Sequence, residues 1–347
     1  MTSSAYRVFA SAISLDPFVR FSIGFSFHFN HSESRTALAM PLAAQAQYPE
    51  RDIRVVVPWG AGGGTDAIAR KLTEIAEGEI GGTMYVENIE GGVSATGISQ
   101  VMRAQADGYT LGILTYDSVV TIPWQGLLPS YKLENLKLVA RVTSEPDALV
   151  VDADSEYESL EQMLAAAEEN PQSIRVGVQN LGGRTHLALL QLQELAGVEF
   201  QVISYPGGAG PQKEAILSGE IVGAVTSLGD FSNLLQDGTV EGLAEFSSAP
   251  NPTYPDVPLA KDQGVDLEIG SFIVLAVPAE TPDEVVSQIE AAYQAAYDSD
   301  EFQDWVANVG VTPSWLGTDE VTAWAEETQQ TLFEEMDALV EQGILTK

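Results

Sequence analysis

The chain has no cysteine and few histidines, and both shortages exclude classes of function. With no cysteine in 347 residues, disulfides, cysteine-ligated zinc, iron–sulfur clusters and thiol nucleophiles are excluded. Three histidines occur, and only His186 lies beyond residue 46. The G-x-S-x-G and H-E-x-x-H patterns are also absent, so neither a hydrolase elbow nor a multi-histidine metal site is predicted. We expect no catalytic residue, metal or cofactor, and we expect His186 to pack or support a neighbour rather than act as a base.

Basic residues are also scarce. The sequence has 16 Lys and Arg against 50 Asp and Glu, a formal net charge of -34, and no segment gathers the basic residues into a stripe. This argues against nucleic acid as a partner, because phosphate contacts need clustered Lys and Arg. Such a surplus makes a compact chain repel itself in dilute buffer, and salt screens that repulsion. We interpret it as adaptation to salt; an acidic protein that needs no salt is the alternative.

Beyond the N-terminal segment, no stretch approaches the roughly 20 consecutive apolar residues that span a bilayer. Near the start, Arg35 precedes the apolar run 36–44, which ends in the small-x-small pattern Ala44-Gln45-Ala46. This pattern predicts a signal segment, 1–46, cleaved after Ala46. The segment is longer than usual, and a misassigned start codon would explain its length. We expect a periplasmic or secreted protein with 13 basic and 48 acidic residues left after cleavage.

Strand-like and helix-like patterns alternate along the rest of the chain. Apolar and β-branched runs predict strands at 53–57, 84–87, 109–114, 174–178, 200–204 and 221–226. Amphipathic patterns predict helices from residue 68 onward and at 93–106, 159–169, 185–195, 212–217, 282–297, 300–309 and 319–342. This alternation is typical of parallel βαβ units, which bind ligands at the carboxyl ends of their strands. Two further stretches, 136–151 and 272–277, are interpreted as crossings between two α/β lobes, 47–144 with 274–347 and 145–273.

The sharpest local motif is PWGAGGGTDAIAR, residues 58–70, between a predicted strand and a predicted helix. Glycines let a ligand approach backbone N–H groups, and the helix N-terminus favours an anion. Thr65 is the expected N-cap, and Asp66 complements the helix dipole. The motif lacks the lysine of a P-loop and the spacing of G-x-G-x-x-G, so it does not predict nucleotide binding. A tight turn that binds nothing is the alternative.

Several separated blocks carry a family resemblance. They are YPERDIRVVVPWGAGGGTDAIAR, YVENIEGGVSATG, ADGYTLGIL, VGVQNLGGRTHLAL, VISYPGGAGPQKEAILSGEIVGAV and YPDVPLAKDQG. In this order they resemble the solute-binding proteins of tripartite tricarboxylate transporters, also called the Bug family. The resemblance covers about residues 48–347. It implies a type II periplasmic-binding-protein fold, with a cleft between two α/β lobes that closes on a di- or tricarboxylate, or in some members an aromatic carboxylate or amino acid.

The resemblance also implies which residues form the ligand site. In the first lobe they are Gly60, Ala61, Gly62, Gly63, Gly64, Thr65, Asn88, Ser94, Thr115, Asp117 and Ser118. In the second lobe they are Asn180, Gly182, Gly183, Arg184, Thr185, Tyr205, Gly207, Gly208, Ser227 and Asp230.

The sequence departs from the family pattern around the second-lobe helix start. The family usually has G-x-G-S-x-x-H there, whereas this chain has NLGGRTH at 180–186; the family's P-Y-x-G-G is SYPGG at 204–208, and Trp59 stands where a smaller residue is common. These departures affect the identity of the ligand. Arg184 is interpreted either as a bidentate carboxylate clamp or as an exposed arginine that offsets acidic neighbours.

The function expected from the sequence is capture of a small carboxylate and its delivery to integral membrane transporter subunits by a monomeric protein without catalytic activity. A subunit that presents its ligand to a membrane sensor kinase is one alternative, and an enzyme on an open α/β fold is another.

Overall fold

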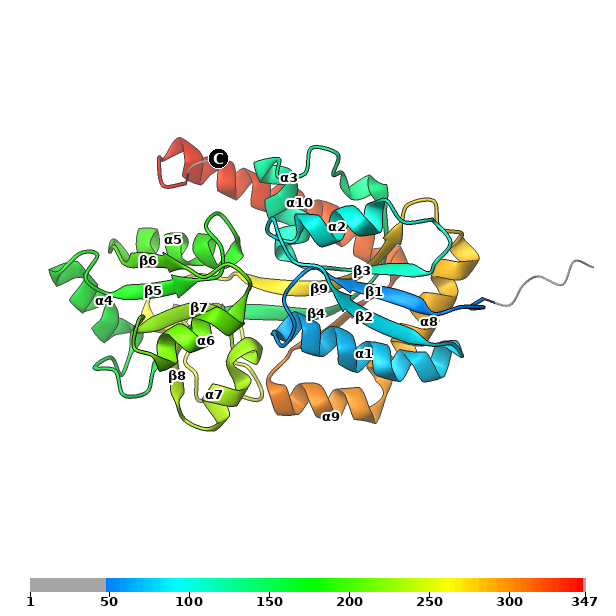
Figure 1. The fold of residues 1–347 in the computed structure, drawn as a ribbon. Helices are drawn as coiled ribbons and strands as arrows, with labels where there is room; N and C mark the ends of the chain where they lie inside the picture. Colours follow the sequence, from blue (N-terminus) through cyan, green and yellow to red (C-terminus); the bar gives the residue numbers. More distant parts are fainter. Residues whose placement is uncertain (1–47, 346–347) are drawn as a thin grey trace, which may run out of the picture. The chain divides into compact units, whose positions relative to one another are not determined.

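The computed structural model describes residues 48–345 (Figure 1). The predicted signal segment, 1–46, and its cleavage after Ala46 lie outside the described residues. Within the described part, one sheet joins eight strands in the order β2 (Met84–Asn88), β1 (Ile53–Val57), β3 (Thr110–Leu114), β9 (Gly270–Pro278), β4 (Leu136–Asp152), β7 (Gly223–Ser227), β5 (Arg175–Val178) and β6 (Gln201–Ser204). Strands β8 (Val240–Glu245) and β10 (Pro313–Leu316) both pair with β4. No described helix is long and apolar enough to cross a membrane.

The first lobe is built on parallel strands β1 (Ile53–Val57), β2 (Met84–Asn88) and β3 (Thr110–Leu114). Helices α1 (Gly64–Ile80) and α2 (Ala95–Met102) connect them. Four of the five residues of β1 are buried, as expected for a strand covered on both faces.

The second lobe repeats this arrangement. Strand β5 pairs in parallel with β6 and β7. The strands of this lobe are β5 (Arg175–Val178), β6 (Gln201–Ser204), β7 (Gly223–Ser227) and β8 (Val240–Glu245). Its helices are α4 (Leu160–Glu169), α5 (Arg184–Ala196), α6 (Ala209–Leu217) and α7 (Ser232–Gln236).

Two antiparallel strands, β4 (Leu136–Asp152) and β9 (Gly270–Pro278), run between the lobes. The first part of β4, up to Pro146, pairs with β9, and the part from Asp147 onward pairs with β7. Both predicted crossings lie within these strands. The exact lobe boundaries, at 144/145 and 273/274, stay a prediction.

The C-terminal elements pack on the first lobe. They are α8 (Asp283–Asp298), α9 (Asp300–Val309), β10 (Pro313–Leu316) and α10 (Thr318–Glu341). Ile68 and Leu72 of α1 share one hydrophobic core with Ile289 and Tyr293 of α8. The Tyr293 hydroxyl also lies 3.1 Å from Thr73 Oγ1, so the first half of the chain and its end form one packed layer.

Some predicted boundaries are wrong, and the reasons are local. Helix α2 starts at Ala95 rather than at 93 because Val93 and Ser94 have φ of 54° and 74°, outside the helical region. Helix α6 starts at Ala209, before the predicted 212. The sequence also failed to predict β8, β10, α7 and the paired short helices η1 (Asp117–Thr121) and α3 (Ile122–Gln125).

Candidate functional site

A cavity of about 110 Å³ lies where the loops after strands of both lobes meet. The loop after β1, the start of η1 after β3, the residue after β5, the loop before α6 and the end of β7 all contribute to its wall. The carboxyl ends of parallel strands are where open α/β sheets bind ligands. The cavity therefore occupies the position that the fold predicts for a binding site.

Three helices begin at this cavity, and glycine is the N-cap of each. The N-caps are Gly63 for α1, Gly183 for α5 and Gly208 for α6, and none carries a side-chain cap. Away from the cavity, Ser159 and Ser299 cap α4 and α9 with their own hydroxyls. Glycine N-caps leave the first N–H groups of a helix free for another acceptor, and those groups favour an anion.

Two of these helix starts already receive a carboxylate from the opposite lobe. Asp230 of the second lobe accepts a hydrogen bond from Gly64 N of α1 at 2.8 Å. Asp117 of the first lobe accepts one from Arg184 N of α5 at 3.1 Å. Gln125 Nε2 also donates to Gly182 O across the lobes at 2.9 Å. The lobes are thus held together by reciprocal contacts at two helix starts.

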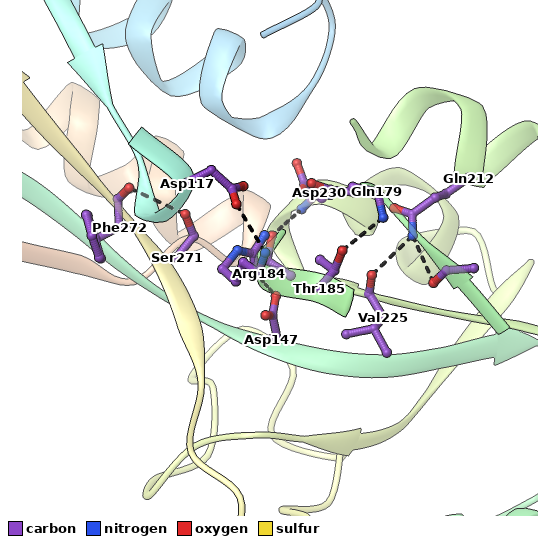
Figure 2. Close-up of polar contacts among 12 residues, drawn as sticks. Asp117, Asp147, Gln179, Arg184, Thr185, Gln212, Val225, Asp230, Ser271 and Phe272 are labelled. Atoms are coloured by element: carbon purple, nitrogen blue, oxygen red, sulfur yellow. Dashed lines mark hydrogen bonds and ion pairs between the residues drawn. The ribbon is translucent and has the colours of Figure 1, made fainter. Parts of the chain in front are cut away.

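Arg184 is buried and ion-paired with Asp147 (Figure 2). Its side chain is 6% exposed and that of Asp147 is fully buried, so the interpretation of Arg184 as an exposed arginine is wrong. Arg184 lines the cavity, and Asp147 on β4 compensates its charge. Each charge of this buried pair offsets the other, and breaking such a pair is costly.

Two further buried carboxylates line the cavity. Glu145 accepts a hydrogen bond from Thr143 Oγ1 at 2.8 Å, and burial together with the nearby Asp230 raises the pKa of Glu145 to about 7. Burial also raises the pKa of Asp117, although the Thr121 hydroxyl at 2.7 Å and the charge of Arg184 oppose that shift. The cavity wall is therefore rich in carboxylates that burial destabilises in their charged form.

Of the predicted site residues, twelve line the cavity. They are Gly60, Ala61, Gly63, Gly64, Thr65, Thr115, Asp117, Arg184, Gly207, Gly208, Ser227 and Asp230. The others do not line it: Gly62, Asn88, Ser94, Ser118, Asn180, Gly182, Gly183, Thr185 and Tyr205.

Several of the non-lining residues support the loops instead. Asn88 Nδ2 donates to Trp59 O at 2.9 Å and to Asp66 Oδ1 at 2.8 Å. Thr185 Oγ1 accepts from Gln179 N at 2.9 Å. These hydrogen bonds hold the loops that form the cavity wall, and contact of Asn88 and Thr185 with a ligand stays a prediction.

Two neighbouring hydroxyls and one imidazole have the same supporting role. Ser94 Oγ and Ser118 Oγ lie 3.0 Å apart, and both residues are fully buried. His186 Nδ1 accepts from Gly182 N at 2.9 Å. Burial lowers the pKa of His186, which keeps the imidazole neutral and able to accept this bond.

The expected N-cap of α1 needs correction. Gly63, not Thr65, is the N-cap, and Thr65 lies inside the first turn. Asp66 is in that turn as predicted, where Gly62 N, Asn88 Nδ2 and Arg70 Nε donate to its carboxylate. These bonds to Asp66 hold the glycine loop in place.

The sequence did not predict every residue of the cavity wall. The residues missed are Trp59, Glu145, Gln179, Ala209, Gly210, Pro211 and Ser271. Glu145 and Ser271 lie on the crossing strands, which were interpreted only as connections. The stretch 136–151 also contains Lys137, Arg141 and Asp147, so its sequence held no signal that singled out Glu145.

Comparison with known proteins identifies the family. The sequence profile of the tripartite tricarboxylate transporter family receptors matches residues 68–338. The chain belongs to this family. Protein BugT of Bordetella pertussis is 28% identical over 307 residues, which cover 85% of this chain and 93% of BugT.

Solved structures agree on the fold. The periplasmic binding protein BugD superposes with a TM-score of 0.79 at 25% identity, covering 86% of this chain and all of BugD. Rhodopseudomonas palustris Rpa4515 with adipate has a TM-score of 0.78 at 23% identity, covering 83% of this chain and 96% of that one. MatC from the same species with bound malate has a TM-score of 0.75 at 22% identity, covering 83% and 99%. The fold is thus the α/β fold of the family's periplasmic binding proteins.

Proposed function

We propose that this protein is a periplasmic solute-binding protein that captures a small carboxylate and delivers it to the membrane subunits of a tripartite tricarboxylate-type transporter. The observation that carries the proposal is the open N-terminus of α6 at the cavity wall. Ala209 and Gly210 both line the cavity, and no described side chain caps α6. Free N–H groups at a helix start bind carboxylates well.

The relatives support this ligand class. Two structures of the same fold hold adipate and malate, both small dicarboxylates. Delivery to membrane subunits, periplasmic location and a monomeric state follow the family and stay part of the proposal. The enzyme alternative has less support, because the matching structures include the periplasmic binding protein BugD and His186 Nδ1 already accepts a hydrogen bond from Gly182 N.

A charge introduced at the start of α6 tests the proposal. A Cβ added to Gly210 meets no heavy atom within 4 Å, so a side chain can be introduced there without a clash at its Cβ. The carboxylate of Gly210→Asp interacts favourably with the helix dipole, so folding is preserved while the ligand's carboxylate loses its position. Gly210→Asn, with the same shape and no charge, is the matched control.

The measurement is the thermal shift and affinity for succinate, malate, adipate, citrate, tricarballylate, glutamate, nicotinate and benzoate at matched ionic strength. A ligand at a hundredfold excess over Kd stabilises the native state by about 2.7 kcal/mol. We expect at least one acid to raise the melting temperature of the wild type and of Gly210→Asn, and not of Gly210→Asp. Stabilisation by a neutral sugar alone would contradict the proposal.

A further inference from the structure

A second cavity, of about 540 Å³, lies beside the crossing strands. It is on the other face of β4 from the solute cavity, because successive side chains of a strand point to opposite faces. Glu145 lines the solute cavity, whereas Ser144 and Pro146 line the second one, as do their β9 partners Phe272 and Gly270. The rest of the second wall comes from the residue after β3, from α5, from the segment after β8 and from α10. Both lobes therefore contribute to this cavity.

Two residues of this wall each carry a buried polar atom that has no hydrogen-bond partner among residues 48–345. The atoms are Tyr116 Oη and Gln191 Oε1. Tyr116 is 2% exposed and precedes η1 in the first lobe, and Gln191 lies on α5 in the second. Buried polar atoms of proteins are normally hydrogen-bonded. A ligand hydroxyl suits both atoms, because it accepts from a tyrosine hydroxyl and donates to an amide oxygen.

The wall also holds Arg141, a half-buried cation that takes part in no ion pair of the described residues. Its guanidinium donates to Ser314 Oγ at 2.7 Å and lies 4.5 Å from the centre of the Trp324 ring. Glu268 and Glu335 line the same cavity, but both are exposed to solvent, where salt screens their charge. An anionic group of a ligand is the counterion that Arg141 lacks.

A row of aromatic rings connects the two polar ends of the wall. The Tyr116 ring lies 6.3 Å from that of Phe272, and Phe272 packs edge to face against Trp324 at 4.8 Å. Arg141 covers Trp324 at the end of this row. Ligand sites typically combine such an apolar wall with a few polar groups. A cavity of about 150 Å³ holds one benzene, so the second cavity has room for a ring with substituents at both ends.

We propose that the second cavity is a binding site for a hydroxylated aromatic anion. The hydroxyl of this ligand bonds to Tyr116 and Gln191, its ring packs along the aromatic row, and its anionic group binds Arg141. The site is additional to the solute cavity and does not depend on the proposed function. Because Tyr116 and Gln191 belong to different lobes, a ligand between them favours the arrangement of the lobes seen here.

Pairs of acids that differ by one hydroxyl test this inference. Calorimetry without any solute compares 4-hydroxybenzoate with benzoate, 4-hydroxyphenylacetate with phenylacetate, and 3-(4-hydroxyphenyl)propanoate with 3-phenylpropanoate. The three lengths place the charge at different distances from the hydroxyl. In at least one pair we expect the hydroxylated acid to bind about tenfold tighter or more, and its neutral primary amide to bind weaker than the acid by about the same factor.

Variants assign the binding to this cavity. Tyr116→Phe should remove the preference for the hydroxylated acid and still fold, because the hydroxyl has no described partner to lose. Gln191→Leu should also reduce the preference, and it keeps the test available if Tyr116→Phe does not fold. The matched control is Tyr131→Phe, which removes another buried hydroxyl without a described partner, outside this cavity. That control and Gly210→Asp, which alters the solute cavity, should both keep the preference.

The remaining outcomes overturn the inference. Equal affinities within all three pairs would mean that ordered water, and not a ligand, completes the bonds of Tyr116 and Gln191. Equal affinities of the acid and its amide would show that Arg141 does not bind the anionic group. A preference that survives Tyr116→Phe, or that is lost in Gly210→Asp, would place the acid in the solute cavity instead.

Discussion

At the scale of single residues, the pair of Arg184 and Asp147 joins the start of α5 to the crossing strand β4. Asp147 is the residue at which β4 changes its partner from β9 to β7. Both side chains are buried, so each charge depends on the other for compensation. The pair thus fixes the position of α5, whose N-terminus forms part of the cavity, relative to the strand that joins the lobes.

Removing one member of this pair should be costly for folding. We expect Arg184→Ala to lower the free energy of unfolding by about 3–5 kcal/mol, because it leaves Asp147 charged and buried without a partner. Replacing both, as Arg184→Met with Asp147→Leu, should recover most of the loss. Urea denaturation of the wild type, Arg184→Ala and the double variant gives the free energy of unfolding of each. A loss below 1 kcal/mol for Arg184→Ala would mean that water reaches Asp147.

Glu145 should make stability depend on pH. Its pKa is raised from 4.5 to about 7 in the folded protein, so between these values the folded state binds more protons than the unfolded state. The stabilising contribution of protonated Glu145 is therefore full below pH 4.5, decreases as pH rises through about 7, and is constant above it. The groups facing Glu145 are Asp230, Arg184 and Thr143.

The comparison variant is Glu145→Gln, which keeps the shape and cannot ionise. We expect its melting temperature, relative to that of the wild type, to rise as pH goes from 5 to 8 without ligand. Subtracting the wild-type melting temperature from that of Glu145→Gln at each pH cancels the contributions of the carboxylates that both proteins share. A constant difference across this range would show that Glu145 titrates like an exposed glutamate.

At the scale of elements, the start of α1 forms one of the contacts between the two lobes. A Cβ on Gly64 would lie 2.5 Å from Asp230 Oδ1 and 3.8 Å from its Cα. No side chain larger than glycine fits there while Asp230 keeps its bond to Gly64 N. The residue type at this position therefore sets how closely the second lobe approaches α1.

Two glycines of α1 provide a matched comparison. Gly64→Ala should weaken ligand binding by about tenfold or more, the cost of losing a charge-assisted hydrogen bond in the closed arrangement. Gly78→Ala lies in the same helix and meets nothing within 4 Å, so it should leave affinity unchanged and stabilise folding by about 0.5–1 kcal/mol. Calorimetry gives the affinities, and small-angle scattering should show a larger radius of gyration for ligand-free Gly64→Ala. Equal affinities for both variants would contradict this role of Gly64.

The elements themselves were largely predictable, whereas their contacts across the cavity were not. Strands such as Ile53–Val57 and helices such as Asp300–Val309 match the predicted ranges, because apolar periodicity is a local property of the sequence. The bond from Gly64 N to Asp230 joins residues 166 positions apart, and no periodicity encodes it. The role of Asp147 beside Arg184 likewise depends on the packing of β4 against α5.

At the scale of the whole molecule, acidic residues far outnumber basic ones. Residues 47–347 hold 48 acidic and 13 basic residues, and the described residues form few ion pairs. Those of Arg51 and Lys137 involve exposed partners, where a pair contributes little. Repulsion among the acidic side chains is therefore only weakly offset by local pairing.

Salt should accordingly stabilise this protein. The distance over which charges interact falls from about 10 Å at 0.1 M salt to about 3 Å at 1 M, so repulsion among the acidic side chains weakens while the buried Arg184–Asp147 pair is screened much less. We expect a higher melting temperature in 2 M KCl than in 50 mM KCl, and a similar rise in potassium acetate, because screening depends on ionic strength and not on the anion. Salt should also speed association with an anionic solute, since the field of the acidic surface repels it at low ionic strength. A melting temperature that is constant or falls in both salts would show that the acidic surplus is not an adaptation to salt, whereas a rise in only one of them would point to a specific ion effect instead of screening.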